Sequence, residues 1–72
     1  MQIKQFIQLA KSGALKEVTV SKVVEGYSII AVTENTTEII RTQLGHPRIF
    51  KNWETLTSRL DDAEIKNFRV IG

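Results

Sequence analysis

The segment from Arg41 to Trp53 holds most of the side chains in this sequence that could do chemistry. It contains the only His, the only Pro and the only Trp of the chain, three of its ten basic residues, and no acid. Basic side chains interleaved with rings are typical of nucleic-acid-binding surfaces, because the cations meet phosphates and the rings stack on bases. The residues that would form such a surface are Arg41, Gln43, His46, Arg48, Phe50, Lys51 and Trp53. The alternative is structural: Phe50 and Trp53 fix the loop to the core, and the basic side chains are merely solvated.

Residues that could support catalysis or metal binding are sparse. His46 could act as a general base or a metal ligand, but the chain has no second His and no Cys to complete either kind of site. A loop His before a Pro is more often an exposed turn residue. The acidic cluster Asp61, Asp62 and Glu64 lacks the alternating oxygen ligands of a calcium loop and is typical of an exposed helix end. We therefore expect no catalytic residue, no cofactor and no metal.

The length and composition describe one small domain over residues 1–72. A chain of 72 residues buries only about 60% of its surface on folding, which allows one core. With 42% hydrophobic residues and a net charge of +2, it is expected to fold. The longest apolar run, Ile29 to Val32, is far shorter than the roughly 20 residues of a membrane span. The absence of Cys fits a reducing compartment, so we expect a cytoplasmic protein that contacts no membrane.

Two stretches have the apolar spacing of amphipathic helices. The first helix is predicted to end near Ser12, because Gly13 suits a left-handed C-terminal cap. Its apolar face would consist of Ile3, Phe6, Ile7 and Ala10. The second is predicted to follow Asn52, a good N-cap, and to end near Asp62. Its apolar face would consist of Trp53, Leu56 and Leu60.

Four stretches have the composition and alternation of strands. The first begins at Glu17, and the others span Tyr27 to Thr33, Glu38 to Gln43 and Asn67 to Ile71. Short turns between the first three strands predict an antiparallel meander. The handedness of strand-helix-strand crossovers favours a last strand parallel to the first, with sheet order 3-2-1-4. The predicted fold is α+β, with element order α-β-β-β-α-β and both helices on one face.

The second predicted strand is apolar on both of its sides, which suggests a sheet face available to a partner. Tyr27, Ile29 and Ala31 fall on one side of the strand, and Ile30 and Val32 fall on the other. We expect Tyr27, Ile30 and Val32 to form an interaction surface, with a second copy of the chain as one candidate partner. The alternative is that neighbouring strands cover Ile30 and Val32 within a monomer.

Two segments of the sequence resemble a known family. The run from Thr42 to Leu56, together with the opening Ile3 to Lys16, resembles the small ParC-like, partition-associated proteins of plasmids and integrative mobile elements. The matching motif positions are Gln43, Arg48, Phe50 and Lys51. The resemblance implies an accessory role in the maintenance of a mobile element and no catalytic residue. The α-β-β-β-α order also looks like the double-stranded RNA-binding domain, but that family's Gly-Pro-x-His-type loop is absent, so this likeness is one of topology.

These observations predict a non-catalytic accessory protein of a plasmid or mobile element. It would bind DNA or a DNA-bound protein through residues 41–53. The competing hypothesis is a protein-protein interaction module, an adaptor or inhibitor, that uses the open face of its sheet.

Overall fold

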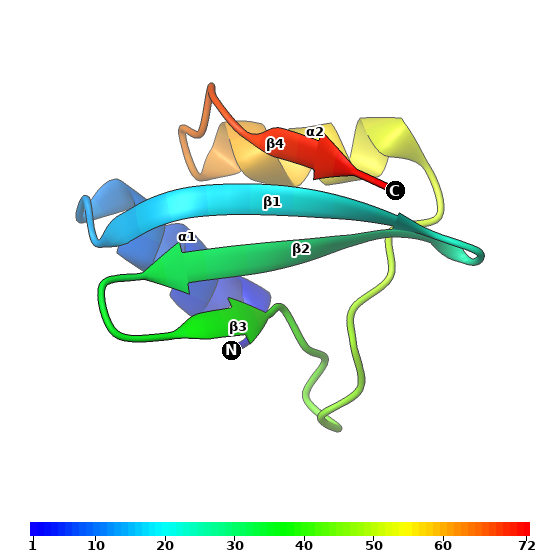
Figure 1. Cartoon of the computed structure of the whole chain (residues 1–72), viewed down its shortest axis with the longest axis horizontal. Coiled ribbons are helices and arrows are strands. Elements are labelled where there is room, and N and C mark those ends of the chain that lie inside the picture. The colour runs from blue at the N-terminus through cyan, green and yellow to red at the C-terminus, as the bar shows by residue number, and fades with distance from the viewer.

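The computed structural model describes all 72 residues and shows a four-stranded sheet with both helices on one of its faces (Figure 1). The predicted α+β class and element order are confirmed. The elements are α1 (Ile3–Lys11), β1 (Leu15–Val23), β2 (Gly26–Thr33), β3 (Thr37–Ile39), α2 (Trp53–Asp62) and β4 (Arg69–Ile71). The sheet face toward the viewer in Figure 1 carries no helix.

The strands lie in the order β3-β2-β1-β4, as predicted. β2 is antiparallel to both of its neighbours, and β4 is parallel to β1, with Val20 opposite Val70. Two parallel strands in one sheet need a crossover connection, which α2 supplies between β3 and β4. β3 and β4 therefore form the two opposite edges of the sheet.

The core lies between the helices and the covered face of the sheet. Phe6 of α1 and Leu56 of α2 are fully buried, and so are Val20 of β1 and Ile29 of β2. Burial of an aliphatic or aromatic side chain of this size stabilises the fold by about 1.5–3 kcal/mol. The complete core consists of Phe6, Val18, Val20, Ile29, Ala31, Ile40, Phe50, Leu56, Leu60 and Ala63.

Both helices end as their sequences predict. The C-cap of α1 is Ser12, and Gly13 follows with φ +79°, a conformation that costs glycine little. At the start of α2, Oδ1 of Asn52 accepts hydrogen bonds from the backbone N–H of Thr55 (3.0 Å) and from its hydroxyl (2.6 Å). These contacts satisfy a donor that the first helical turn leaves without a partner.

Two strands are shorter than predicted. The third was expected over residues 38–43 but is Thr37–Ile39, and the last was expected over residues 67–71 but is Arg69–Ile71. After β3, Ile40 turns its side chain into the core, and Arg41 pairs with Pro47 rather than with β2. The chain therefore leaves the sheet where the sequence still has the composition of a strand.

The chain returns to the sheet at Phe50, which pairs with the start of β2, whereas β3 pairs with its second half. Tyr27 and Phe50 exchange two backbone hydrogen bonds, with N···O distances of 2.9 and 2.8 Å. Gly26 lies beneath this contact with φ +148°, and a Cβ built there would overlap the carbonyl oxygen of Phe50. The close approach of the two backbones therefore requires glycine at this position.

We predict that Gly26→Ala lowers the free energy of unfolding by about 2 kcal/mol or more, because it adds both an unfavourable φ and a clash. Gly45→Ala is the matched control: Gly45 also has a positive φ, +88°, but no atom lies within 4 Å of a Cβ built there. The control should lose only about 1 kcal/mol. Urea unfolding measures both values, and equal losses would contradict the proposed role of the Tyr27–Phe50 contact.

Candidate nucleic-acid-binding surface

Residues 41–47 form a tight loop that extends from the β3 edge of the sheet (Figure 1). We call it the 41–47 loop. Its base is closed by the Arg41–Pro47 bridge and by a hydrogen bond from the N–H of Thr42 to the carbonyl of His46 (2.8 Å). Its tip is closed by the N–H of Gly45, which donates to the carbonyl of Thr42 (3.0 Å). The loop thus has a defined backbone and is not a loose connection.

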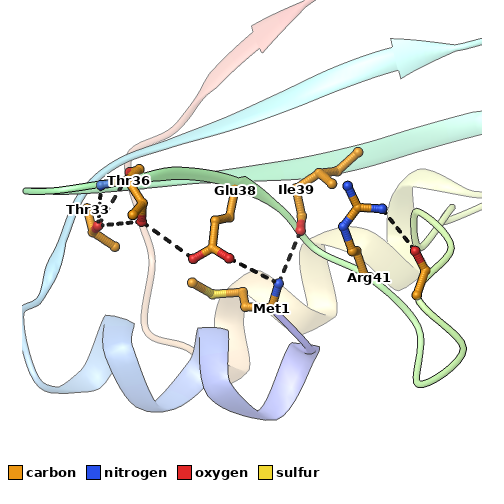
Figure 2. A network of polar contacts seen from close by, with 7 residues as sticks. Met1, Thr33, Thr36, Glu38, Ile39 and Arg41 are labelled. Atoms are coloured by element: carbon orange, nitrogen blue, oxygen red, sulfur yellow. Dashed lines mark hydrogen bonds and ion pairs between the residues drawn. The ribbon is translucent and has the colours of Figure 1, made fainter.

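Two hydrogen bonds fix Arg41, one from its side chain and one from its backbone. Its Nη1 donates to the carbonyl of Gly45 at 2.9 Å (Figure 2), and its backbone N–H donates to the carbonyl of Met1 at 2.7 Å. The side chain is nevertheless exposed. A guanidinium has five N–H donors, so one bond to Gly45 leaves it able to bind an anion.

Phe50 is buried, whereas the neighbouring Arg48 is only half-buried. Phe50 is only 4% exposed and belongs to the core, so its ring is closed to a base, contrary to the predicted stacking role. Arg48 is half-buried, with its Cζ 5.5 Å from the centroid of the Phe50 ring. This cation-π contact orients the guanidinium at the edge of the core. Lys51, the next residue after Phe50 in the chain, is exposed.

Trp53, the first residue of α2, lies in an aromatic cluster at the surface. Its ring is in an edge-on contact with Tyr27 at 5.2 Å between centroids and lies 6.1 Å from Phe68. Trp53 keeps 39% of its surface exposed. Tyr27 therefore lies on the helix side of the sheet. The predicted grouping of Tyr27 with Ile30 and Val32 in one surface on the open face is wrong.

His46 and Gln43 are exposed in the 41–47 loop. No group of three or more His, Cys, Asp or Glu side chains is arranged to hold a metal ion. Neither helix has the length and the apolar run that a membrane crossing needs.

A polar hollow of about 560 Å³ separates α1 from the 41–47 loop. None of its lining residues is acidic: they are Met1, Gln2, Lys4, Gln5, Gln8, Arg41, Thr42, Gln43 and Gly45. Arg41 and Gln43 belong to the binding surface predicted from the sequence, whereas Lys4, Gln5 and Gln8 do not. A usable signal was present, because no Asp or Glu occurs before Glu17.

The carboxylate of Glu38, beside this region, is paired. Its Oε1 lies 3.7 Å from the amino group of Met1, and its Oε2 accepts a hydrogen bond from the hydroxyl of Thr36 at 3.4 Å (Figure 2). The same amino group donates to the carbonyl of Ile39 at 3.5 Å. These contacts tie the chain start to β3 and offset the negative charge of Glu38.

The open face of the sheet carries a small apolar group. Ile30 and Ile39 are cross-strand partners, and Val32 follows Ile30 on the same side of β2. All three are half-buried. Beside them lie Thr19 and Ser28, which neighbouring side chains bury although no helix covers this face. Ile30 and Val32 thus lie on the uncovered face, and their role as an interaction surface stays a prediction.

Comparison with protein-family models, curated proteins and solved structures finds no match to this chain.

We predict that Arg41→Ala changes the free energy of unfolding by no more than about 0.5 kcal/mol, because its side-chain hydrogen bond is at the surface and its backbone bonds remain. Thermal or urea unfolding tests this. A loss several times larger would mean that the Arg41–Gly45 contact holds the loop together, and binding data on this variant would then report folding.

Proposed function

We propose that this chain is a non-catalytic accessory protein that binds DNA through the basic surface at residues 41–53, in the maintenance of a plasmid or other mobile element. The observation that carries the binding proposal is that residues 41–53 hold Arg41, Arg48 and Lys51 and no acid, and that no acidic residue lines the hollow beside the 41–47 loop. The mobile-element context rests on the resemblance to the ParC-like proteins alone.

The surface has the properties that a polyanion requires. Arg41 and Lys51 are exposed, and Arg48 is oriented by the ring beneath it. Trp53, at the end of the same segment, keeps a partly exposed ring. Phosphate contacts supply most of the affinity in such complexes, and they do not need a deep cleft. A protein of net charge +2 can bind in this way when its cations are gathered on one side.

We predict that the wild type binds a fluorescein-labelled DNA duplex with a steep loss of affinity as salt rises, because phosphate neutralisation releases counterions. Arg48→Ala combined with Lys51→Ala should weaken binding near physiological salt by about fivefold for each phosphate that the variant no longer neutralises. Fluorescence anisotropy at several salt concentrations measures both effects.

The matched control is Lys66→Ala combined with Arg69→Ala, which removes the same charge beside β4, at the opposite edge of the sheet. Arg69 is paired with Glu17 at 3.3 Å, but both side chains are exposed, so the control should keep its fold. Equal weakening by the two double variants would show that only net charge matters and would contradict a site at residues 41–53.

A second candidate function, a protein-protein interaction module, is favoured by the contiguous Ile30, Val32 and Ile39 on the uncovered face. A second copy of the chain could cover these side chains and exclude water from them.

If this face forms a dimer, Ile30→Asp should give a monomer with unchanged far-UV circular dichroism, because a charge buried in an interface has no partner there. Light scattering on the wild type and the variant measures the mass of each. Thr37→Asp, on the exposed margin of the same face, is the control. A monomeric wild type, or an unfolded Ile30→Asp variant, would contradict the dimer.

A further inference from the structure

The solvent side of α1 is composed entirely of lysine and glutamine. Four side chains of this helix are exposed, and they are Lys4, Gln5, Gln8 and Lys11. Its other side chains are buried or half-buried, and Ile3, Phe6, Ile7 and Ala10 belong to or pack against the core. Packing determines the apolar side of an amphipathic helix, but it leaves the solvent side free. The lack of any carboxylate there is therefore not a requirement of the fold.

The other helix shows that this composition is not general in the molecule. The exposed charged residues of α2 are Glu54, Asp61 and Asp62, and all are acidic. Its one basic residue, Arg59, is half-buried and lies 3.4 Å from Asp62. The helix layer thus has a basic half and an acidic half, and the basic half borders the 41–47 loop.

The hollow joins α1 to the surface already proposed to bind DNA. Residues from both segments line it, and they include the cations Lys4 and Arg41 and four glutamines. The hollow on the other side of α1 is different, since Glu34 and Glu38 line it. A polyanion beside α1 is therefore favoured on the side of the 41–47 loop.

The exposed stripe of α1 has side chains that suit a DNA groove. Lys4 and Lys11 are seven residues apart, which is two helical turns or about 10 Å along the axis, and they lie on the same side of the helix. The major groove of B-form DNA is about 12 Å wide and admits an α-helix, with phosphates along both of its margins. Gln8 lies between the two lysines on the same stripe, and a glutamine amide can donate to and accept from a base edge.

From these placements we infer that α1 lies in the major groove of duplex DNA, with Lys4 and Lys11 on phosphates and Gln5 and Gln8 against base edges, while the hollow takes the phosphate backbone next to Arg41. The inference rests on the proposed function, because it assigns the nucleic acid and the docking element of the same surface. It selects DNA over duplex RNA because the major groove of A-form RNA is too narrow for a helix.

The decisive variant is Lys4→Ala combined with Lys11→Ala, probed with a labelled DNA duplex. Alanine favours the helix and all four α1 positions are exposed, so the variants should fold, which circular dichroism checks. We expect affinity near physiological salt to fall by about 25-fold and the slope of log affinity against log salt to decrease by about two. The Lys66→Ala, Arg69→Ala control should keep the wild-type slope.

Base reading is tested by selection from a pool of duplexes with a randomised centre. The wild type should enrich particular sequences and bind them at least about tenfold more tightly than unselected duplexes. Gln5→Ala combined with Gln8→Ala should lose this preference and keep its affinity for unselected duplexes. Enrichment of no sequence by the wild type, or an unchanged preference in the variant, would overturn the groove assignment.

The results separate this inference from the proposed function. Wild-type binding that depends on Arg48 and Lys51 but not on Lys4 and Lys11 would overturn the α1 inference and leave the proposed function standing. Binding of no DNA by the wild type would overturn both. Binding of duplex RNA as tightly as DNA, with the same loss in the α1 lysine variant, would overturn the placement in a major groove.

Discussion

The backbone pair between Tyr27 and Phe50 is the contact on which the arrangement of the molecule depends. It brings the chain back to β2 after the 41–47 loop, directs the Phe50 ring into the core, and places Asn52 where α2 must begin. The segment that leaves the sheet at Ile40 is thereby anchored at both ends, so its loop extends outward as a hairpin. Gly26 makes the contact possible, because any side chain there would meet the Phe50 carbonyl.

The order of elements followed from the sequence because each element has a clear apolar period and clear end residues, such as Gly13 and Asn52. The sheet order followed because few topologies satisfy a three-stranded meander and a crossover to a parallel strand. The ends of the third and fourth strands could not be predicted from the sequence. Residues 40–43 have the composition of a strand, but whether they pair depends on the return of the chain at Pro47 and Phe50, which is a contact between distant segments.

The candidate site was predictable in part, because some of its features are local in sequence and others depend on contacts between distant segments. The basic segment is local in sequence, so the sequence alone identifies Arg41, Arg48 and Lys51 as candidate residues. The burial of Phe50 and the position of Tyr27 beside Trp53 depend on tertiary pairing, and residue type alone does not distinguish a ring that stacks on a base from one that fills a core. The hollow combines residues 1–8 with residues 41–45, and the hydrogen bond from Arg41 to Met1 joins these segments.

A net charge of +2 is small, so the distribution of charged side chains over the surface matters more than the net charge. The acidic C-terminal end of α2, with Asp61 and Asp62, lies at the top of the view in Figure 1, and the 41–47 loop lies at its bottom. A polyanion that approaches the acidic end is repelled, whereas one that approaches the loop meets Arg41 and the lysines of α1. In the proposed complex with DNA, this arrangement would orient the protein before contact, and salt at 0.1 M would screen the effect beyond about 10 Å. Pairing Glu38 with Met1 belongs to the same arrangement, because an unpaired carboxylate there would repel a phosphate entering the hollow from that side.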